Sequence, residues 1–439
     1  RGVRTKKDVM AKKVILASMI VLAVVGAVVL FLVRGKQQKD QIREQAYAKS
    51  IQAIESLGYT IDPQVLKKRL AIPAADNAAP IYRAVAKEFE SGGKVDGAWT
   101  AGRDRAAVLA TLDSQEPEIY KTLTKATTKD RCDLGWDWSL GPQMHVPEIT
   151  WMKRMAAYCT YLAIADARRN DLDSALERLL VADRIGRHIA QEPISIANLE
   201  EYSNRTILLD IATKIVSSRP VDQKSVDFLR RLADSVQDLT PTLGSIEFEV
   251  LDGYLALHDY ALEDIYSASS GQGAPSTHKK DFDPVPRQIA ITLLLNRMAE
   301  LHKIWSTKAT GVEIGALVLD FDDKIQFDTT PGADLVRVML PPFSGAYRSY
   351  AWASSSTDML QYVGTLLGQY VSSNGKIDAS SPPTDSYTGK PFVVTHVKNT
   401  LKVYSLGQNG TDDGGPRKPG YNSPIGGNDD FGFLITLNK

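Results

Sequence analysis

One apolar run near the N-terminus limits what this chain can fold into. Residues 14–33 (VILASMIVLAVVGAVVLFLV) contain no charged side chain. A helix of this length is roughly 30 Å long, which matches the hydrocarbon thickness of a lipid bilayer. A buried core helix is the first alternative, but Lys13 and Arg34 border the run directly. We therefore expect residues 14–33 to form one transmembrane helix in contact with the lipid bilayer.

A cleaved signal peptide is the second alternative for this run. The apolar region of a signal peptide is typically about 7–15 residues long and ends in a small-x-small cleavage site. Here Phe31, Leu32 and Val33 lead directly to Arg34. An uncleaved membrane anchor fits this pattern better.

The charges on the two flanks predict how the anchor is oriented. Residues 1–13 carry six basic side chains against the single acidic Asp8, while the segment after Arg34 mixes basic residues with Asp40 and Glu44. The more basic flank of a membrane helix is normally retained in the cytoplasm. We therefore expect a cytoplasmic basic tail at 1–13 and a periplasmic location, outside a bacterial inner membrane, for everything after Arg34.

Composition sets the class of the remaining chain. The 439 residues are 43% hydrophobic and 24% charged, which is typical of a globular protein. The 52 basic and 52 acidic residues cancel, so we expect no nucleic-acid partner.

The only cysteines are Cys132 and Cys159. Outside the cytoplasm they could form a disulfide, and the alternative is two separate buried thiols.

Helical patterns occupy most of the chain after the anchor. Residues 34–58 are rich in helix formers and predict a helical stalk that ends at Gly58. Residues 59–375 contain further amphipathic stretches, and the clearest of them, 150–218, predicts an antiparallel helical hairpin with a small alanine-rich face. We expect an extracytoplasmic α-helical bundle over 59–375, so the predicted fold is mainly α.

The tail has a different composition. Residues 376–439 are rich in Gly, Asp, Asn, Ser and Pro, with short β-branched or aromatic runs at 391–397, 401–406 and 431–437. Runs of this length and composition predict strands. We expect a small β appendage after the helical domain.

Two stretches of the tail carry a resemblance to a known family. They read PTDSYTGKPF at 383–392 and VYSLGQNGTDDGG at 403–415, and an acidic pair follows before the last strand. This pattern resembles the C-terminal segment of the major pseudopilins of type II secretion, in which the loop binds calcium. The resemblance implies a calcium site whose ligands would be Asn409, Asp412, Asp413, Asp429 and Asp430.

Two interpretations of this loop stay open. Calcium needs about six to eight oxygen ligands on a loop bent by glycine, and these side chains could supply them. Asn-Gly and Asp-Gly pairs also form plain turns between two strands for backbone reasons alone. Apart from possible calcium, we expect no cofactor.

A second resemblance covers more of the chain. The ending YSLGQNGTDDGG at 404–415, together with the hairpin at 150–218, resembles poorly characterised membrane-anchored helical proteins from planctomycetes and related bacteria. This resemblance implies the same architecture of membrane anchor and helical domain.

Sequence motifs give no catalytic assignment. The chain contains no G-x-S-x-G, H-E-x-x-H or phosphate-loop motif. We therefore expect a structural or accessory subunit of a membrane or envelope complex, which binds other membrane proteins and is not an enzyme. The alternatives are a secretion- or pilus-associated component, or an extracytoplasmic hydrolase whose carboxylates the sequence does not single out.

Aromatic residues recur near helical spacing in one stretch before the tail. This spacing predicts either core packing or a surface for docking a partner. The residues are Tyr347, Tyr350, Trp352, Tyr362 and Tyr370.

Overall fold

The protein is described by a computed structural model that is mainly helical and ends in a small antiparallel sheet, as the sequence predicts. It describes the backbone of residues 6–101, 104–236, 239, 246–259, 284–307, 309–422 and 429–437. Within these ranges the side chains are described except at 6–23, 100, 101, 284–286 and 422.

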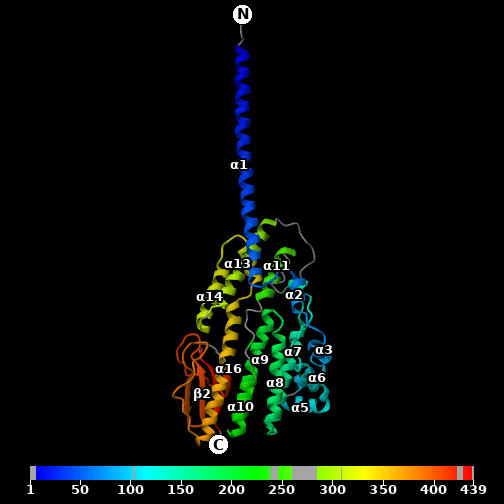
Figure 1. Ribbon diagram of the computed structural model, residues 1–439, viewed down its shortest axis with the longest axis vertical. Coiled ribbons are helices and arrows are strands. Elements are labelled where there is room, and N and C mark those ends of the chain that lie inside the picture. Colours follow the sequence, from blue (N-terminus) through cyan, green and yellow to red (C-terminus); the bar gives the residue numbers. More distant parts are fainter. Residues whose placement is uncertain are drawn as a thin grey trace.

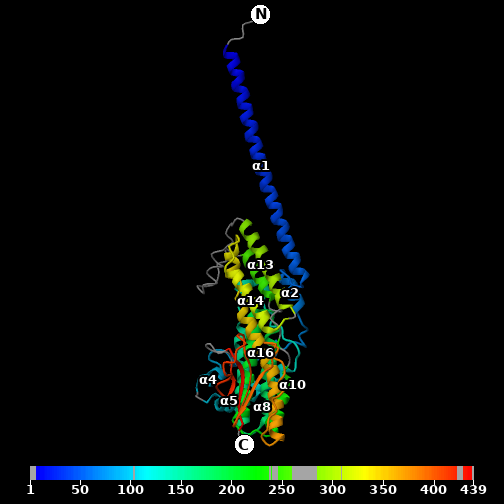
Figure 2. The same ribbon diagram turned by 90° about the vertical axis from the view of Figure 1, so that its left-hand side faces the viewer.

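Helix α1 (Lys6–Ser56) projects far beyond the folded body, so its N-terminal end lies at one extreme of the molecule (Figure 1). The view turned by 90° shows the same projection (Figure 2). The predicted anchor and stalk are thus one continuous helix. Its C-terminal end belongs to the body, because α1 packs against α13 (Pro284–Trp305) and Ile54 is fully buried. Tyr47 of α1 also approaches a third helix, α11 (Ile246–Asp259), where its hydroxyl lies 3.4 Å from that of Tyr254.

The predicted transmembrane helix falls partly outside the described side chains. Residues 14–23, the first half of the expected span, are outside this set, and residues 24–33 are inside it. Among the described residues, no helix combines the length and apolarity needed to cross a membrane.

Short helices build one side of the body around an apolar cluster that includes Trp136, Trp138 and Met152. These elements are α2 (Pro63–Leu70), α3 (Ala79–Arg83), η1 (Ala86–Glu88), α4 (Lys94–Ala101), α5 (Arg105–Gln115), α6 (Pro117–Thr127) and η2 (Trp138–Gln143). Proline at the first helical position favours the start of α2 and of α6, since proline lacks the N–H that would be unpaired there.

The helical hairpin predicted for 150–218 is confirmed in its first part as α7 (Pro147–Arg168) and α8 (Leu172–Ile189), which pack along each other. The rest of the stretch forms a third helix, α9 (Ser195–Ser217). Asn170 adopts a left-handed φ of 67° in the turn between α7 and α8. Asp171 then caps α8 by accepting a hydrogen bond from the Ser174 N–H at 3.0 Å. Asn and Asp favour this kind of turn, so the sequence signal had a physical basis.

The remaining helices complete the body and surround the larger apolar cluster. They are α9 (Ser195–Ser217), α10 (Gln223–Ser235), α11 (Ile246–Asp259), α13, α14 (Gly311–Gln326), α15 (Ala333–Met339) and α16 (Phe343–Ser372).

The tail forms a sheet beside α16 (Figure 1). Its strands are β1 (Val393–Val397), β2 (Thr400–Ser405), β3 (Gly420–Asn422) and β4 (Phe431–Thr436), all antiparallel in the order β1-β2-β4-β3. Leu401, Val403 and Phe433 are fully buried in the same apolar cluster as the residues of α16. The sheet is therefore integrated into the body and has no separate core.

One buried carboxylate joins α16, the sheet and the turn that links them. Asp385 is fully buried. Its Oδ1 accepts hydrogen bonds from Ser355 Oγ of α16 (2.6 Å) and from the Tyr387 N–H (2.9 Å). Its Oδ2 accepts from Ser405 Oγ of β2 (2.6 Å) and from the Thr388 hydroxyl and N–H (2.7 and 3.3 Å). All these donors would be unsatisfied without this acceptor.

We expect Asp385→Asn to lower the melting temperature of the protein by several degrees. The amide replaces one acceptor oxygen with a donor, and a buried polar group left without a partner costs roughly 1–3 kcal/mol. Thermal unfolding followed by circular dichroism measures the change. The matched control is Asp378→Asn, an exposed carboxylate whose hydrogen-bond partner is the nearby Ser380 of its own turn. Equal melting temperatures for the two variants would contradict the role of Asp385.

Candidate functional site

The acidic residues of the tail do come together in space. Asp413 lies in the loop after β2, and Asp430 lies immediately before β4, the neighbouring strand. The Asp413 N–H donates to Asp430 Oδ2 at 2.8 Å, and the Asp429 N–H donates to Asp413 Oδ2 at 3.3 Å. Asn409 Nδ2 also donates to Asp413 Oδ2 at 3.1 Å. The sequence therefore grouped these residues correctly.

Their oxygens, however, accept hydrogen bonds from the protein itself. Asp430 Oδ2 also accepts the Gly415 N–H at 2.8 Å, and burial raises the pKa of Asp430. Asp412 Oδ1 accepts from the Tyr404 hydroxyl at 3.0 Å and from the Gly414 N–H at 2.9 Å. Across the described residues, no group of three or more His, Cys, Asp or Glu side chains could hold a metal ion.

The geometry thus favours the plain turn over the calcium site that the pseudopilin resemblance implied. Gly407 shows why glycine is needed in this turn. Its φ is +65°, and a Cβ at this position would lie 2.0 Å from the carbonyl oxygen of Asp429. The calcium site at Asn409, Asp412, Asp413, Asp429 and Asp430 therefore stays a prediction, because one oxygen each of Asp412, Asp413 and Asp430 already accepts a hydrogen bond within the protein.

The structure distinguishes between the two alternatives that the sequence left open for the cysteines. Cys132 and Cys159 are both free thiols, each buried in the apolar cluster of the short helices. Burial raises the pKa of both thiols, because the thiolate would lose its hydration. The alternative of two separate buried thiols is therefore the one observed.

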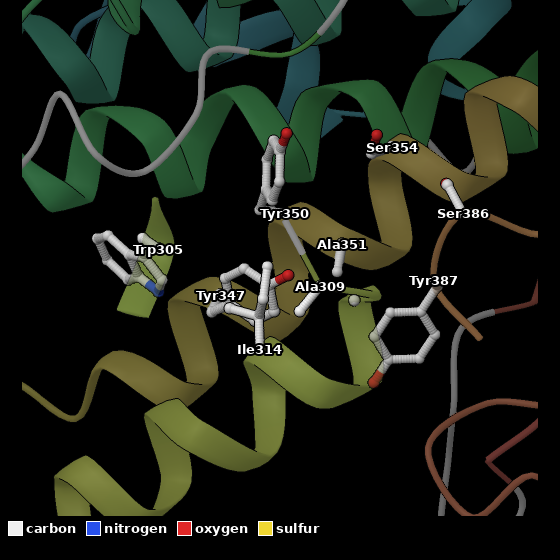
Figure 3. A pocket seen from close by; sticks show the side chains of 10 residues that line it. Trp305, Ala309, Ile314, Tyr347, Tyr350, Ala351, Ser354, Ser386 and Tyr387 are labelled. Atoms are coloured by element: carbon white, nitrogen blue, oxygen red, sulfur yellow. The ribbon is translucent and has the colours of Figure 1, made fainter. Parts of the chain in front are cut away.

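A pocket of about 330 Å³ lies where α13, α14 and α16 meet the turn that follows Asp385 (Figure 3). Four of its ten lining residues are aromatic, and none is charged. It is lined by Trp305, Ala309, Gly311, Ile314, Tyr347, Tyr350, Ala351, Ser354, Ser386 and Tyr387. We call it the aromatic pocket.

The rings of the aromatic pocket are held in fixed positions. Trp305 and Tyr347 lie nearly parallel, with an interplanar angle of 25° and ring centroids 6.4 Å apart. Tyr387 is fixed by its backbone, since its N–H donates to Asp385 and its carbonyl accepts the Val312 N–H at 2.9 Å. A Cβ on Gly311 would lie 2.5 Å from the Tyr387 ring, so glycine makes room for that ring.

The aromatic stripe, which the sequence predicted as core packing or a docking surface, supplies two of the four aromatic residues of this pocket. The stripe contained Tyr347 and Tyr350, but not Trp305 or Tyr387, which come from α13 and from the tail turn. Tyr370 of the same stripe is buried in the main core. Tyr347 belongs to this same core cluster and is 6% exposed, so it both packs in the core and lines the pocket.

Buried acids form a further set that sequence reasoning missed. Glu192, only 2% exposed, accepts the Leu134 N–H at 2.6 Å, and burial raises its pKa to about 8. On α11, burial and then the neighbouring Glu249 raise the pKa of Asp252 to about 8. Neither Asp252 nor Glu249 lines the aromatic pocket. No motif around these residues distinguishes them from exposed acids.

Comparisons with models of protein families, with curated proteins and with solved structures found no match to the chain. The two sequence resemblances therefore stay predictions.

Glu192 predicts a specific pH dependence of stability. Because its folded pKa is raised from about 4.5 to about 8, its contribution to stability is complete below about pH 4.5 and is lost as the pH rises through 8. We expect the melting temperature of the wild type, relative to Glu192→Gln, to fall between about pH 5 and about pH 9. Thermal unfolding at several pH values tests this.

The control for this experiment is Glu118→Gln, which changes an exposed carboxylate on α6. Its melting temperature should follow that of the wild type at every pH. A constant difference between the wild type and Glu192→Gln across the range would contradict the titration of Glu192 in this window.

Proposed function

We propose that this chain is a single-pass protein of a bacterial inner membrane, with its body on the periplasmic side, and that it serves as a structural or accessory subunit of a membrane or envelope complex. Its N-terminal tail would lie in the cytoplasm. The proposal rests on α1 more than on any pocket.

The observation that carries the proposal is the exposed apolar surface on every side of α1 over residues 24–33. The exposed fractions at Val24, Val25, Val28, Val29, Leu30, Phe31, Leu32 and Val33 range from 47% to 77%. Successive helical residues differ by about 100° around the axis, so this run leaves no polar face. Contiguous apolar surface of this kind marks a membrane or protein contact. A helix that is apolar on all sides is covered either by lipid or by the core of a protein assembly, and the projection of α1 beyond the body favours lipid.

The attachment of α1 to the body supports an anchor that also positions the domain. The helix continues without interruption from its apolar part to Ser56, and Ser50 and Ile54 are buried against the body. The body is therefore held at a fixed distance from the apolar run.

We expect a double substitution Val24→Arg with Val28→Arg to release the protein from the membrane. Each arginine near the centre of a membrane helix costs roughly 2.5–3.5 kcal/mol. The matched control is Ile42→Arg with Ala46→Arg, two exposed positions at the same spacing on α1 but outside the span 14–33. The measurement is the fraction left in the membrane pellet after alkaline extraction. Equal retention of both double variants would argue against the anchor.

A contact with another membrane subunit is supported at Gly26. A Cβ at this position would have no atom within 4 Å, so the backbone of α1 is open there. Small residues allow close approach of a second helix in a membrane. Val28 lies about 200° around the axis from Gly26, on the opposite side of the helix.

Purification in a gentle detergent, with mass spectrometry of the intact complex, tests the subunit role. We expect the wild type and Val28→Leu to copurify with stoichiometric membrane partners, and Gly26→Leu to lose them because the larger side chain blocks helix approach. A wild-type protein that purifies as a lone monomer would overturn the subunit role. That outcome is distinguishable from failure of the anchor, which the extraction experiment measures.

A further inference from the structure

The aromatic pocket has the size and lining of a small-molecule site. Its volume of about 330 Å³ falls at the lower end of the roughly 300–1,000 Å³ typical of ligand pockets. Four aromatic side chains line it, together with two serines and small apolar residues. The walls come from three helices and the tail turn, so the pocket exists only when the sheet is docked on α16.

A buried donor faces this pocket without a partner. Trp305 is 8% exposed, and its indole Nε1 has no hydrogen-bond partner among the described residues. Figure 3 shows this nitrogen on the side of the ring that faces Tyr347. Buried N–H groups are nearly always paired in folded proteins, so an unpaired one that faces a cavity indicates a place for an acceptor.

The lining also restricts the charge of a ligand. None of its described residues is charged. An anion would therefore bury its charge without a cationic partner, which is costly. A cation would likewise find no carboxylate in the lining to balance its charge. An uncharged molecule avoids both penalties.

The arrangement of the rings favours a flat ligand. Trp305 and Tyr347 lie nearly parallel, and Tyr387 closes the pocket from the tail turn (Figure 3). Aromatic rings pack well against planar or ring-shaped partners in stacked and edge-to-face arrangements. The Ser354 side chain adds a hydroxyl at the rim.

We propose that the aromatic pocket binds a small, uncharged, planar molecule whose hydrogen-bond acceptor meets the indole N–H of Trp305. The proposed ligand site lies between α13, α14 and α16. Ligand binding there does not depend on the membrane anchor. Such a site adds ligand binding to a chain whose proposed role is structural.

The test is an NMR titration of the full chain in detergent, with ¹⁵N-labelled tryptophan. Each of the four probe molecules contains one benzene ring. Benzamide is uncharged and carries a carbonyl acceptor, benzoate is an anion, benzyltrimethylammonium is a cation, and toluene has no acceptor. The Trp305 indole signal is assigned by its loss in Trp305→Phe. We expect benzamide to shift this signal saturably, and the two charged probes to bind about tenfold more weakly.

Variants separate binding in the pocket from general partition into detergent. Ala309→Leu fills the pocket and should abolish the benzamide shift, while Ala157→Leu, a half-buried alanine on α7, should leave it unchanged. Trp305→Phe keeps a ring but removes the donor. Saturation-transfer signals should then show weaker binding of benzamide, by about fivefold or more, and unchanged binding of toluene.

Three results would overturn the proposal. They are an unshifted Trp305 signal at saturating benzamide, equal binding of benzamide and benzoate, and a benzamide shift that survives in Ala309→Leu. If Ala309→Leu does not fold, the paired benzamide and toluene measurements on Trp305→Phe decide the question alone.

Discussion

The carboxylate of Asp385 is the contact on which the arrangement of the C-terminal half depends. It collects hydroxyl donors from α16 and β2 and backbone donors from its own turn, so three segments far apart in sequence are fixed relative to one point. A carboxylate is suited to this role, because its two oxygens together offer about four acceptor sites. The same turn places Tyr387 in the wall of the aromatic pocket. Sheet docking and pocket shape therefore share one cause.

Sequence patterns predicted the elements that short-range interactions determine, namely the α7–α8 hairpin and the strands of the tail. The hairpin of α7 and α8 follows from apolar periodicity and from Asn170 and Asp171, whose side chains favour the turn and cap found there. The strands of the tail follow from short β-branched runs. The docking of that sheet into the main core was not predictable, because it depends on which side chains of α16 and the strands face each other across long sequence separations.

For the candidate sites too, the sequence predicted which residues lie near each other but not how their side chains are oriented. The sequence placed Asp413 and Asp430 together, but only the structure shows that their oxygens already accept backbone N–H groups. The pairing of Cys132 with Cys159 failed for a related reason, since an even number of cysteines carries no information on where each side chain packs. Trp305 became notable only when the neighbours of its nitrogen were known. In each case the deciding fact is an orientation, which composition and spacing do not encode.

The unbroken course of α1 into the body has a mechanical consequence. A continuous helix with its last turns buried is a lever, because it has no hinge between the apolar run and the contact with α13. A tilt of the apolar part would turn the body with it, to the extent that the helix between them stays straight. The direction in which the aromatic pocket and the sheet point is thus set by the surroundings of Val24 to Val33, many turns away from either.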